Sequence, residues 1–538
     1  MAITRTPTNP EIRRAHRGCR RFLALRSVER TRLSSSLRRS IIGLSVVCAL
    51  AAPGASAQSW RIVPSVAIEE TLTSNASLLG AAESKGDLVT QLTPGFSIVE
   101  KGARTSLNGS VSVPILLYAR TGSENDKVYP SVNLVGNIEA LEKLFYIDGA
   151  VNVAQQYVSP FGSRPATLDT VSANRYTSET YTFSPYFKGV AQGNIAYEVR
   201  DTNVWTRANQ SLLSSSQFYT NDGLAKVSKD PAPWGWSVEA DRSNVKFPDQ
   251  AALLTQLVRF QISREIDPQL QVSGGVGYED DNYIFADFRN STYNIGARWR
   301  PTERTLVDAE WEHRFFGSSY HFTFDHRTPL SVWTVQASRD VTTYPQQLAG
   351  LPAGLDVSTY LNQLFLTSIP DPVQRANFIA QLIQNGGLPL FLSGGVNLYT
   401  QQATILQTAT ASLGLLGARN NVFFTIFRVR SEPVANAEEP VAGLAGLNDN
   451  TQTGGGITWT YNLTPSLSLN TSANVLRTVE NAPQAGKTNQ GSVVTTLTSP
   501  IATNTTAYVG ARYQQLHSDV STNYNEYAVF VGLTHIFH

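Results

Sequence analysis

Charged side chains recur at alternate positions within otherwise apolar segments, an arrangement suited to lining a wet passage. Arg298 comes about ten residues before Asp308 and Glu310. A tight turn near Glu303 would place Arg298 opposite Asp308 on the next strand, where opposite charges meet across a sheet. Such ladders can set the ion preference of a pore. They can also simply satisfy one another in a wall that cannot place charge in lipid, and the sequence leaves both interpretations open.

On other segments, amide, hydroxyl and further charged side chains also occupy the alternate positions that would face away from lipid. Groups of this kind can form weak hydrogen bonds to sugar hydroxyls. The signs of the charges are mixed, which argues against a strongly ion-selective channel. The alternative is that these side chains are an ordinary wetted wall. The candidate lumen-facing residues are Arg298, Asp308, Glu310, Arg259, Gln261, Gln271, Asn470, Asn474, Tyr508, Arg512 and Gln514.

The sequence offers no catalytic, metal-binding or cofactor-binding constellation. It contains no nucleophile elbow, phosphate loop or convincing serine–histidine pair, so we expect neither an enzyme nor a cofactor. His313, His321 and His326 lie near Asp325, but their spacing is not diagnostic of a metal site.

These side chains would be positioned by short alternating strands. Ile457, Trp459 and Tyr461 alternate with Thr458 and Thr460, and similar segments continue to the end of the chain. One apolar and one polar face over such segments is typical of transmembrane β-strands. Because an open sheet edge in lipid would leave amides unpaired, the sheet must close. The sequence therefore predicts an all-β, antiparallel up-and-down barrel of about 22 strands, within a range of about 18–24.

The predicted connections alternate between short and long, and both chain termini then fall on the periplasmic side. The short turns are expected at Glu100–Gly102, Glu139–Lys143, Asp267–Gln269, Pro301–Glu303, Thr464–Ser466 and Ser499–Pro500. The long external loops are expected at 74–86, 119–127, 158–174, 206–218, 431–451 and 480–490.

Residues 1–57 have the pattern of a signal peptide, with an arginine-rich region, a short apolar run and Ala55-Ser56-Ala57 before a cleavage site. Both cysteines, Cys19 and Cys48, lie in this segment, so disulfides and thiolate sites are not expected in the mature chain. Without residues 1–57 the chain holds 32 basic and 40 acidic side chains, a net charge of −8. This balance does not favour nucleic acid as a partner. Residues 58–538 are expected to form a single barrel domain.

Two further features fit a barrel in an outer membrane. Most of the 8 tryptophans lie within a few residues of a predicted turn, as in an aromatic girdle at the lipid headgroups. In the last segment, Tyr527, Val529, Val531, Leu533 and Phe537 share one face. This aromatic-ended strand resembles the signature read by the barrel-assembly machinery, although His538 follows the phenylalanine.

One insertion, 344–398, interrupts the alternation. The first of its two predicted helices is capped by Asp356 or Ser358, and the second begins at Asp371-Pro372 and ends at Gly386-Gly387. A barrel of this size has a lumen wide enough to leak, so the insertion is expected to plug or cap it. An external lobe packed on neighbouring loops is the alternative.

Several stretches resemble one family, the outer-membrane β-barrels associated with the PEP-CTERM/exosortase system and its exopolysaccharide gene clusters. The stretches are 60–66 with 69–75, the segment 370–376 leading to 386–389, and 524–527. The resemblance covers nearly the whole mature chain through structural motifs. It implies a role beside the export or surface presentation of an exopolysaccharide in a Gram-negative bacterium, and it supplies no binding residues.

Three functions follow as hypotheses. The first is a passive conduit or accessory barrel for exopolysaccharide, with export-system proteins as partners and outer-membrane lipid around it. The second is a general diffusion porin for small solutes, and the third is a structural anchor that binds surface polymer without transport. A plugged, energy-coupled transporter is not expected, because the first strand begins at about Trp60 and leaves no room for an N-terminal plug.

Overall fold

The computed structural model describes residues 59–210, 213–247, 252–283, 286–349, 403–434, 449–481 and 486–537. They belong to one compact unit, Gln58–His538. The predicted signal peptide and most of the 344–398 insertion, including both of its expected helices, lie outside the described residues.

The described residues form strands with two short helices between them. Their order is β1 (Ser59–Thr73), β2 (Asp87–Lys101), β3 (Thr105–Ser112), β4 (Ile115–Tyr118), α2 (Gly122–Asn125), β5 (Lys127–Val128), β6 (Ser131–Leu141), β7 (Phe145–Tyr157), β8 (Arg175–Ala191), β9 (Ile195–Gln210), β10 (Leu213–Lys229), β11 (Trp234–Lys246), β12 (Leu253–Asp267), β13 (Leu270–Tyr283), β14 (Ala286–Thr302), β15 (Thr305–Arg314), β16 (Gly317–Arg327), β17 (Ser331–Thr342), α3 (Tyr344–Ala349), β18 (Thr404–Leu416), β19 (Asn420–Pro433), β20 (Asn450–Thr464), β21 (Leu467–Glu480), β22 (Lys487–Ala502), β23 (Thr505–Ser518) and β24 (Tyr524–Ile536).

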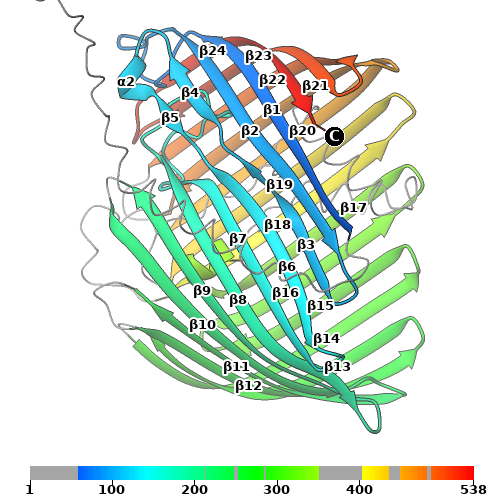
Figure 1. The fold of residues 1–538 in the computed structure, drawn as a ribbon. Coiled ribbons are helices and arrows are strands. Elements are labelled where there is room, and N and C mark those ends of the chain that lie inside the picture. Colours follow the sequence, from blue (N-terminus) through cyan, green and yellow to red (C-terminus); the bar gives the residue numbers. More distant parts are fainter. Residues whose placement is uncertain are drawn as a thin grey trace, which may run out of the picture. The chain divides into compact units, whose positions relative to one another are not determined.

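The strands close into an antiparallel barrel, and from β6 to β24 each strand pairs with the next one in the sequence (Figure 1). The seam is β1 against β24, with Ser65 opposite Ile536 and Thr73 opposite Ala528. Because β3 and β4 both pair with β2, and the two-residue β5 leads into β6, the wall contains 22 full-length strands. The predicted fold class and strand number are confirmed.

Alternation along each strand separates an apolar outer face from a polar inner one. On β20, Ile457 and Trp459 are exposed on the outside, whereas Thr458 and Thr460 are buried on the inside. On β24 and directly after it, the exposed apolar side chains are those expected to share a face, namely Tyr527, Val529, Val531, Leu533 and Phe537. Every tryptophan except the half-buried Trp236 is exposed.

The connections divide between two ends of the barrel. The end that carries the loops after β1, β7, β17, β21 and β23 is called the loop end here, and the opposite end is the turn end. Loops 74–86 and 158–174 have the predicted bounds. Between β21 and β22 the connection is 481–486, shorter than the predicted 480–490. Between β19 and β20, residues 435–448 lie outside the described residues.

Two predicted connections are wrong. Residues 206–218 lie mostly within β9 and β10, where Thr206 pairs with Phe218. A polar segment does not by itself mark a loop, because the strands of a barrel carry polar residues at alternate positions. Ser499 and Pro500 pair with Ala507 and Thr506 inside the β22–β23 ladder, and the turn follows Ala502. A proline near a strand end does not have to mark the turn itself.

The described helices are short. Among the described residues, no helix combines the length and the apolar character needed to cross a bilayer. The helix α3 begins at Tyr344, the first residue of the expected insertion, and the sequence analysis had not placed a helix there. Its start has one of the two bonds of a capping box, because the Gln346 side chain accepts a hydrogen bond from the backbone N–H of Thr343, and a second from the Thr343 hydroxyl.

Candidate functional site in the barrel lumen

The inner wall over β12–β15 brings six of the candidate residues together. Gln271, Arg298 and Asp308 lie in one row across β13, β14 and β15. The predicted register is confirmed, and Arg298 Nε lies 2.7 Å from Asp308 Oδ2. The Arg298 side chain remains half exposed, so this pair faces open space. The remaining members of the set are Arg259, Gln261 and Glu310.

Arg259 on β12 reaches across two strands. Its guanidinium makes a two-pronged contact with Glu312 on β15, with both N–O distances at 2.8 Å. On the intervening strand β13, Gly277 has no side chain that would block this contact. A Cβ there would lie 2.6 Å from Thr292 Oγ1 and 3.3 Å from Arg259 Cγ. The glycine therefore leaves room for the Arg259 side chain to reach Glu312, and the forked guanidinium suits this two-pronged contact.

Three further candidates, Asn470, Asn474 and Tyr508, lie at inward-facing positions but apart from that group. Asn470 is buried on β21, and Asn474 on the same strand is half-buried. Tyr508 donates a hydrogen bond from its hydroxyl to Glu69 Oε2 at 2.9 Å. Gln261, in the β12–β15 group on the other side of the barrel, lies 3.3 Å from Ser273 Oγ. These residues face inward on opposite sides of the barrel, so the structure does not bring the whole candidate set together.

Arg512 is inward-facing but not open to the lumen. Its side chain is 1% exposed, and its guanidinium lies between the carboxylates of Asp169 and Glu526, at 2.8 and 2.7 Å. Glu526 also accepts a hydrogen bond from Thr73 Oγ1 at 2.6 Å, so the group ties β23, β24 and β1 together at the seam. We call Arg512, Asp169 and Glu526 the latch.

Asp169 reaches the latch because loop 158–174, between β7 and β8, folds inward and lies against β21–β23. The backbone N–H of Ala166 donates to Gln514 Oε1 at 3.0 Å. Thr478 Oγ1 donates to the carbonyl of Pro160 at 3.1 Å, and Gln490 Nε2 donates to the carbonyl of Arg164. Gln514 was expected to face the cargo in the lumen, but its side chain instead forms a hydrogen bond with this loop.

The loop is also braced from its own base. Arg175, the first residue of β8, donates to the carbonyls of Thr167, Leu168 and Thr170 at 2.8–3.1 Å. Asn174 accepts from the N–H of Ser159 through its side-chain carbonyl at 2.9 Å. Buried carbonyls that would otherwise lack partners are therefore satisfied, and the inward position is a built feature of the loop.

The electrostatics of the latch favour the charged form of Asp169. Burial by itself would raise the pKa of this carboxyl. The attraction and the hydrogen bonds from Arg512, with a further bond from Thr167, outweigh that effect and hold the pKa of Asp169 below its ordinary value. The carboxylate is therefore ionised at neutral pH, and the ion pair is present.

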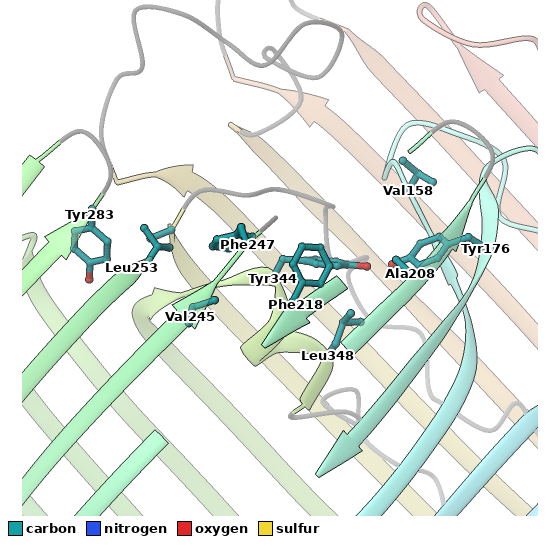
Figure 2. Close-up of a cluster of buried hydrophobic side chains, with 11 residues drawn as sticks. Val158, Tyr176, Ala208, Phe218, Val245, Phe247, Leu253, Tyr283, Tyr344 and Leu348 are labelled. Carbon is teal, nitrogen blue, oxygen red and sulfur yellow. The ribbon is translucent and has the colours of Figure 1, made fainter. Parts of the chain in front are cut away.

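The helix α3 follows β17 at the loop end. It lies against β8, β9 and β10, which are far from β17 in the order of strands around the wall. Tyr344 and Leu348 are fully buried, and the Tyr344 ring packs edge-on against Phe218 at 6.0 Å between centroids (Figure 2). Gln346 Nε2 donates to Ser243 Oγ at 2.9 Å. The described start of the insertion, Tyr344–Ala349, therefore lies against the inner wall. The residues that would distinguish a plug from an external lobe lie outside the described ranges.

A cavity of about 300 Å³ lies between α3 and the inner wall of β9–β17. Its charged lining residues are four aspartates, Asp222, Asp241, Asp281 and Asp340, and three arginines, Arg242, Arg259 and Arg314. We call the wider charged group on this part of the wall the acidic patch: Asp222, Glu239, Asp241, Glu279, Asp281, Glu312 and Asp340, with Lys226, Arg259 and Arg314 as its bases. The mixed signs expected from the sequence are present, but they are unevenly distributed, with carboxylates in excess here.

The histidine group considered from sequence is divided by the wall. His321 pairs across the ladder with Glu310, which faces inward. His326 Nδ1 lies 2.9 Å from Thr305 Oγ1 on the other face. Within the described part of the chain, no three His, Asp, Glu or Cys side chains are arranged to hold a metal ion.

No protein-family model matches the sequence, and no curated protein matches it. Solved barrels are similar in fold. The siderophore receptor PirA of Pseudomonas aeruginosa is 11% identical with a TM-score of 0.39, covering 90% of this chain and 81% of the receptor. The FrpB iron transporter of Neisseria meningitidis (F5-1 variant) is 8% identical with a TM-score of 0.47, covering 88% and 82%. A BenF-like porin of Pseudomonas fluorescens Pf-5 is 8% identical with a TM-score of 0.33, covering 88% and 99%. No substrate is transferred from them to this chain.

Sequence reasoning missed Asp169, Glu526 and the acidic patch. Asp169 is the only acidic residue of loop 158–174, which also contains one base, Arg164, and a single carboxylate in a long loop can indicate a distant partner. The capping box Thr343–Gln346 could likewise have marked the start of α3. Nothing in the sequence, however, indicated which strands these segments would meet.

Proposed function

We propose that this chain is an outer-membrane β-barrel of a Gram-negative bacterium that acts as a passive conduit, with an exopolysaccharide as its cargo. One observation carries the conduit: a closed wall that is apolar outside and polar inside. Closure leaves no unpaired edge in lipid, and a polar inner face keeps the passage wet. The loop end would then face the cell exterior.

The cargo is proposed from the sequence resemblance, and the chemistry of one part of the wall is compatible with it. The inward positions of β18–β22 carry small uncharged polar side chains, including Thr410, Ser412, Thr458, Ser472 and Thr496. Hydroxyl and amide groups can exchange hydrogen bonds with sugar hydroxyls without fixing a polymer in place by strong charge-assisted bonds.

A general diffusion porin for small solutes is the second candidate. It is favoured by loop 158–174 and α3, which both fold inward from the loop end and reduce the space for a polymer. A narrowed, partly charged passage suits solutes of low mass.

Polysaccharide measurements in a strain that lacks the gene separate these functions. If the barrel exports polymer, polymer accumulates inside the deletion strain, and a plasmid copy restores secretion. Unchanged secretion would contradict the export role. Conductance of the purified barrel in planar bilayers would then distinguish a solute porin, which conducts, from an anchor, which does not.

A further inference from the structure

Arginines gather on the outer face of β19 and β21 toward the loop end. On β19, Arg428 and Arg430 occupy the same alternate positions as Ile426, whose side chain is exposed on the outside of the barrel. On β21, Arg477 has the same relation to the exposed Val475. These arginines therefore leave the wall on the side that faces lipid, where charged side chains are unfavourable unless they reach a polar layer or a counter-charge.

Arg428 and Arg477 flank one residue of the strand between them. Both are paired in the sheet with Thr453 of β20. Because adjacent strands lie about 4.8 Å apart, the two arginine backbones are about 10 Å apart, and the long side chains can converge on one anionic group between them. Both side chains are exposed, and among the described residues neither guanidinium has an ion pair or a hydrogen bond.

A second row of the same kind lies beside the first. Gln407 of β18 is paired with Arg430 of β19 on one side and with Arg339 of β17 on the other. These two arginines are partly engaged, Arg430 by Glu432 and Arg339 by the carbonyl of Ser318. Among the described residues, Glu432 is the only carboxylate that pairs with any of the four arginines. The outer face of β17–β21 therefore carries excess positive charge at this level.

The next charged residues toward the loop end do not change this balance. Asp449, directly before β20, and Lys487, the first residue of β22, have opposite signs. Asp449 also accepts a hydrogen bond from the side-chain amide of Asn481 at 2.6 Å.

Between the arginines and the turn end, the same face of β17–β21 carries no charged side chain within the described strands. Its exposed apolar side chains include Trp333, Leu415, Phe424, Ile426, Ile457 and Val475. Arg428 follows the first residue of β19 by 8 positions, and Arg477 follows that of β21 by 10. Since a tilted strand of about 9–11 residues crosses a bilayer, the arginines lie where the strands leave the apolar layer. The face therefore combines an anion-binding edge with an apolar surface below it.

We propose that this face binds a phosphorylated glycolipid of the outer leaflet. Its phosphate lies between Arg428 and Arg477, and its acyl chains lie over Ile426 and Val475. A guanidinium can donate two parallel N–H bonds to a phosphate, and basic clusters at the membrane surface bind lipid headgroups in this way. The exposed Thr453 hydroxyl between the arginines suits a sugar hydroxyl. The site rests on the outer-membrane location in the proposed function, and it is independent of the cargo.

Native mass spectrometry of the purified full chain in a mild detergent tests the site. The probe is lipid A with both phosphates, and the comparisons are the same lipid without phosphates and phosphatidylglycerol. Saturable binding of the phosphorylated lipid A, with little binding of the other two, is the expected result. No saturable binding, or equal binding of the lipid without phosphates, would overturn the proposal, because the arginines would then only extend toward water. Equal binding of phosphatidylglycerol would overturn the assignment to a glycolipid.

Two variants test the residues. The double variant Arg428→Gln with Arg477→Gln removes both charges of the first row at exposed positions, so the barrel should still fold. It should weaken lipid A binding about tenfold or more. The matched control is Arg289→Gln on β14, an exposed, outward-facing arginine that already lies 3.2 Å from Asp280. This variant should bind lipid A as the wild type does, and an equal loss in it would contradict the site.

The location is tested separately, by fractionation of the cell membranes. A barrel found in the outer membrane that does not bind lipid A would contradict the lipid site alone. A barrel absent from the outer membrane would contradict the proposed function as well.

Discussion

Two regions of the inner wall use the same kinds of side chain for different purposes. At the seam, Arg512 and its two carboxylates are fully buried and satisfied by one another, and they hold a loop of the chain itself. Over β10–β17, carboxylates outnumber bases, and the single guanidinium of Arg314 lies within 4 Å of three carboxylates, those of Glu279, Asp281 and Asp340. An inward-facing charge therefore does not by itself indicate a ligand site. The deciding feature is whether another residue of the same chain already pairs with that charge.

Removal of the latch arginine should have the largest effect on the protein. Arg512→Met would leave Asp169 and Glu526 buried without a counter-charge, which costs about 3–5 kcal/mol of unfolding free energy. Urea unfolding followed by tryptophan fluorescence in micelles measures this loss. Arg512→Lys is the control, since it restores the charge without the two-pronged geometry and should recover part of the stability. A wild-type midpoint in Arg512→Met would contradict the buried latch.

Arg298 and Arg512 show which contacts could be predicted from the sequence and which could not. The pairing of Arg298 with Asp308 was predictable, because a tight turn fixes the register and the alternation fixes the face. The pairing of Arg512 with Asp169 was not, because Asp169 lies 343 residues earlier in the chain. The local alternation of polar and apolar residues was thus sufficient to predict the barrel, its strand number and the set of inward-facing residues. Contacts made by inward-folding loops depend on where distant strands lie around the wall, and no period in the sequence encodes that.

Neutralising the acidic patch should change ion preference without unfolding the barrel. In the double variant Asp241→Asn with Asp340→Asn, two partly exposed negative charges are lost, so the attraction of the passage for cations should decrease. The reversal potential in a salt gradient should move toward zero. The matched control is Glu69→Gln, which removes a carboxylate near the seam. A shift of the same size in the control would mean that net charge, and not its position, sets the preference.

The latch should withstand mild acid. Because the pKa of Asp169 is held below its ordinary value, this carboxylate stabilises the folded state above the pKa of about 3.9 that it has when unfolded. That stabilisation is lost only as pH falls through the depressed folded value. Stability should therefore change little between pH 8 and about pH 5 on account of this group. Asp169→Asn should remove the acid-side loss, and an identical acid profile would contradict the assignment.

The smallest effect is expected at the exposed pair. Arg298→Met breaks a contact in which the arginine is half exposed, and such pairs contribute about 0–1 kcal/mol. Its unfolding midpoint should remain near that of the wild type. A loss as large as that of Arg512→Met would erase the distinction between the two regions.

Conductance of a loop-shortened barrel tests the central claim most directly, namely that loop 158–174 narrows a water-filled passage. The N–H of Val158 donates to the carbonyl of Asn174 at 2.9 Å, so the ends of the loop are adjacent and a short Gly-Ser turn can replace residues 160–172. Single-channel recordings in planar bilayers would compare this variant with the wild type and Arg298→Met. We predict a clear rise in conductance for the shortened loop and none for Arg298→Met. An unchanged conductance in a correctly folded loop variant would contradict the account.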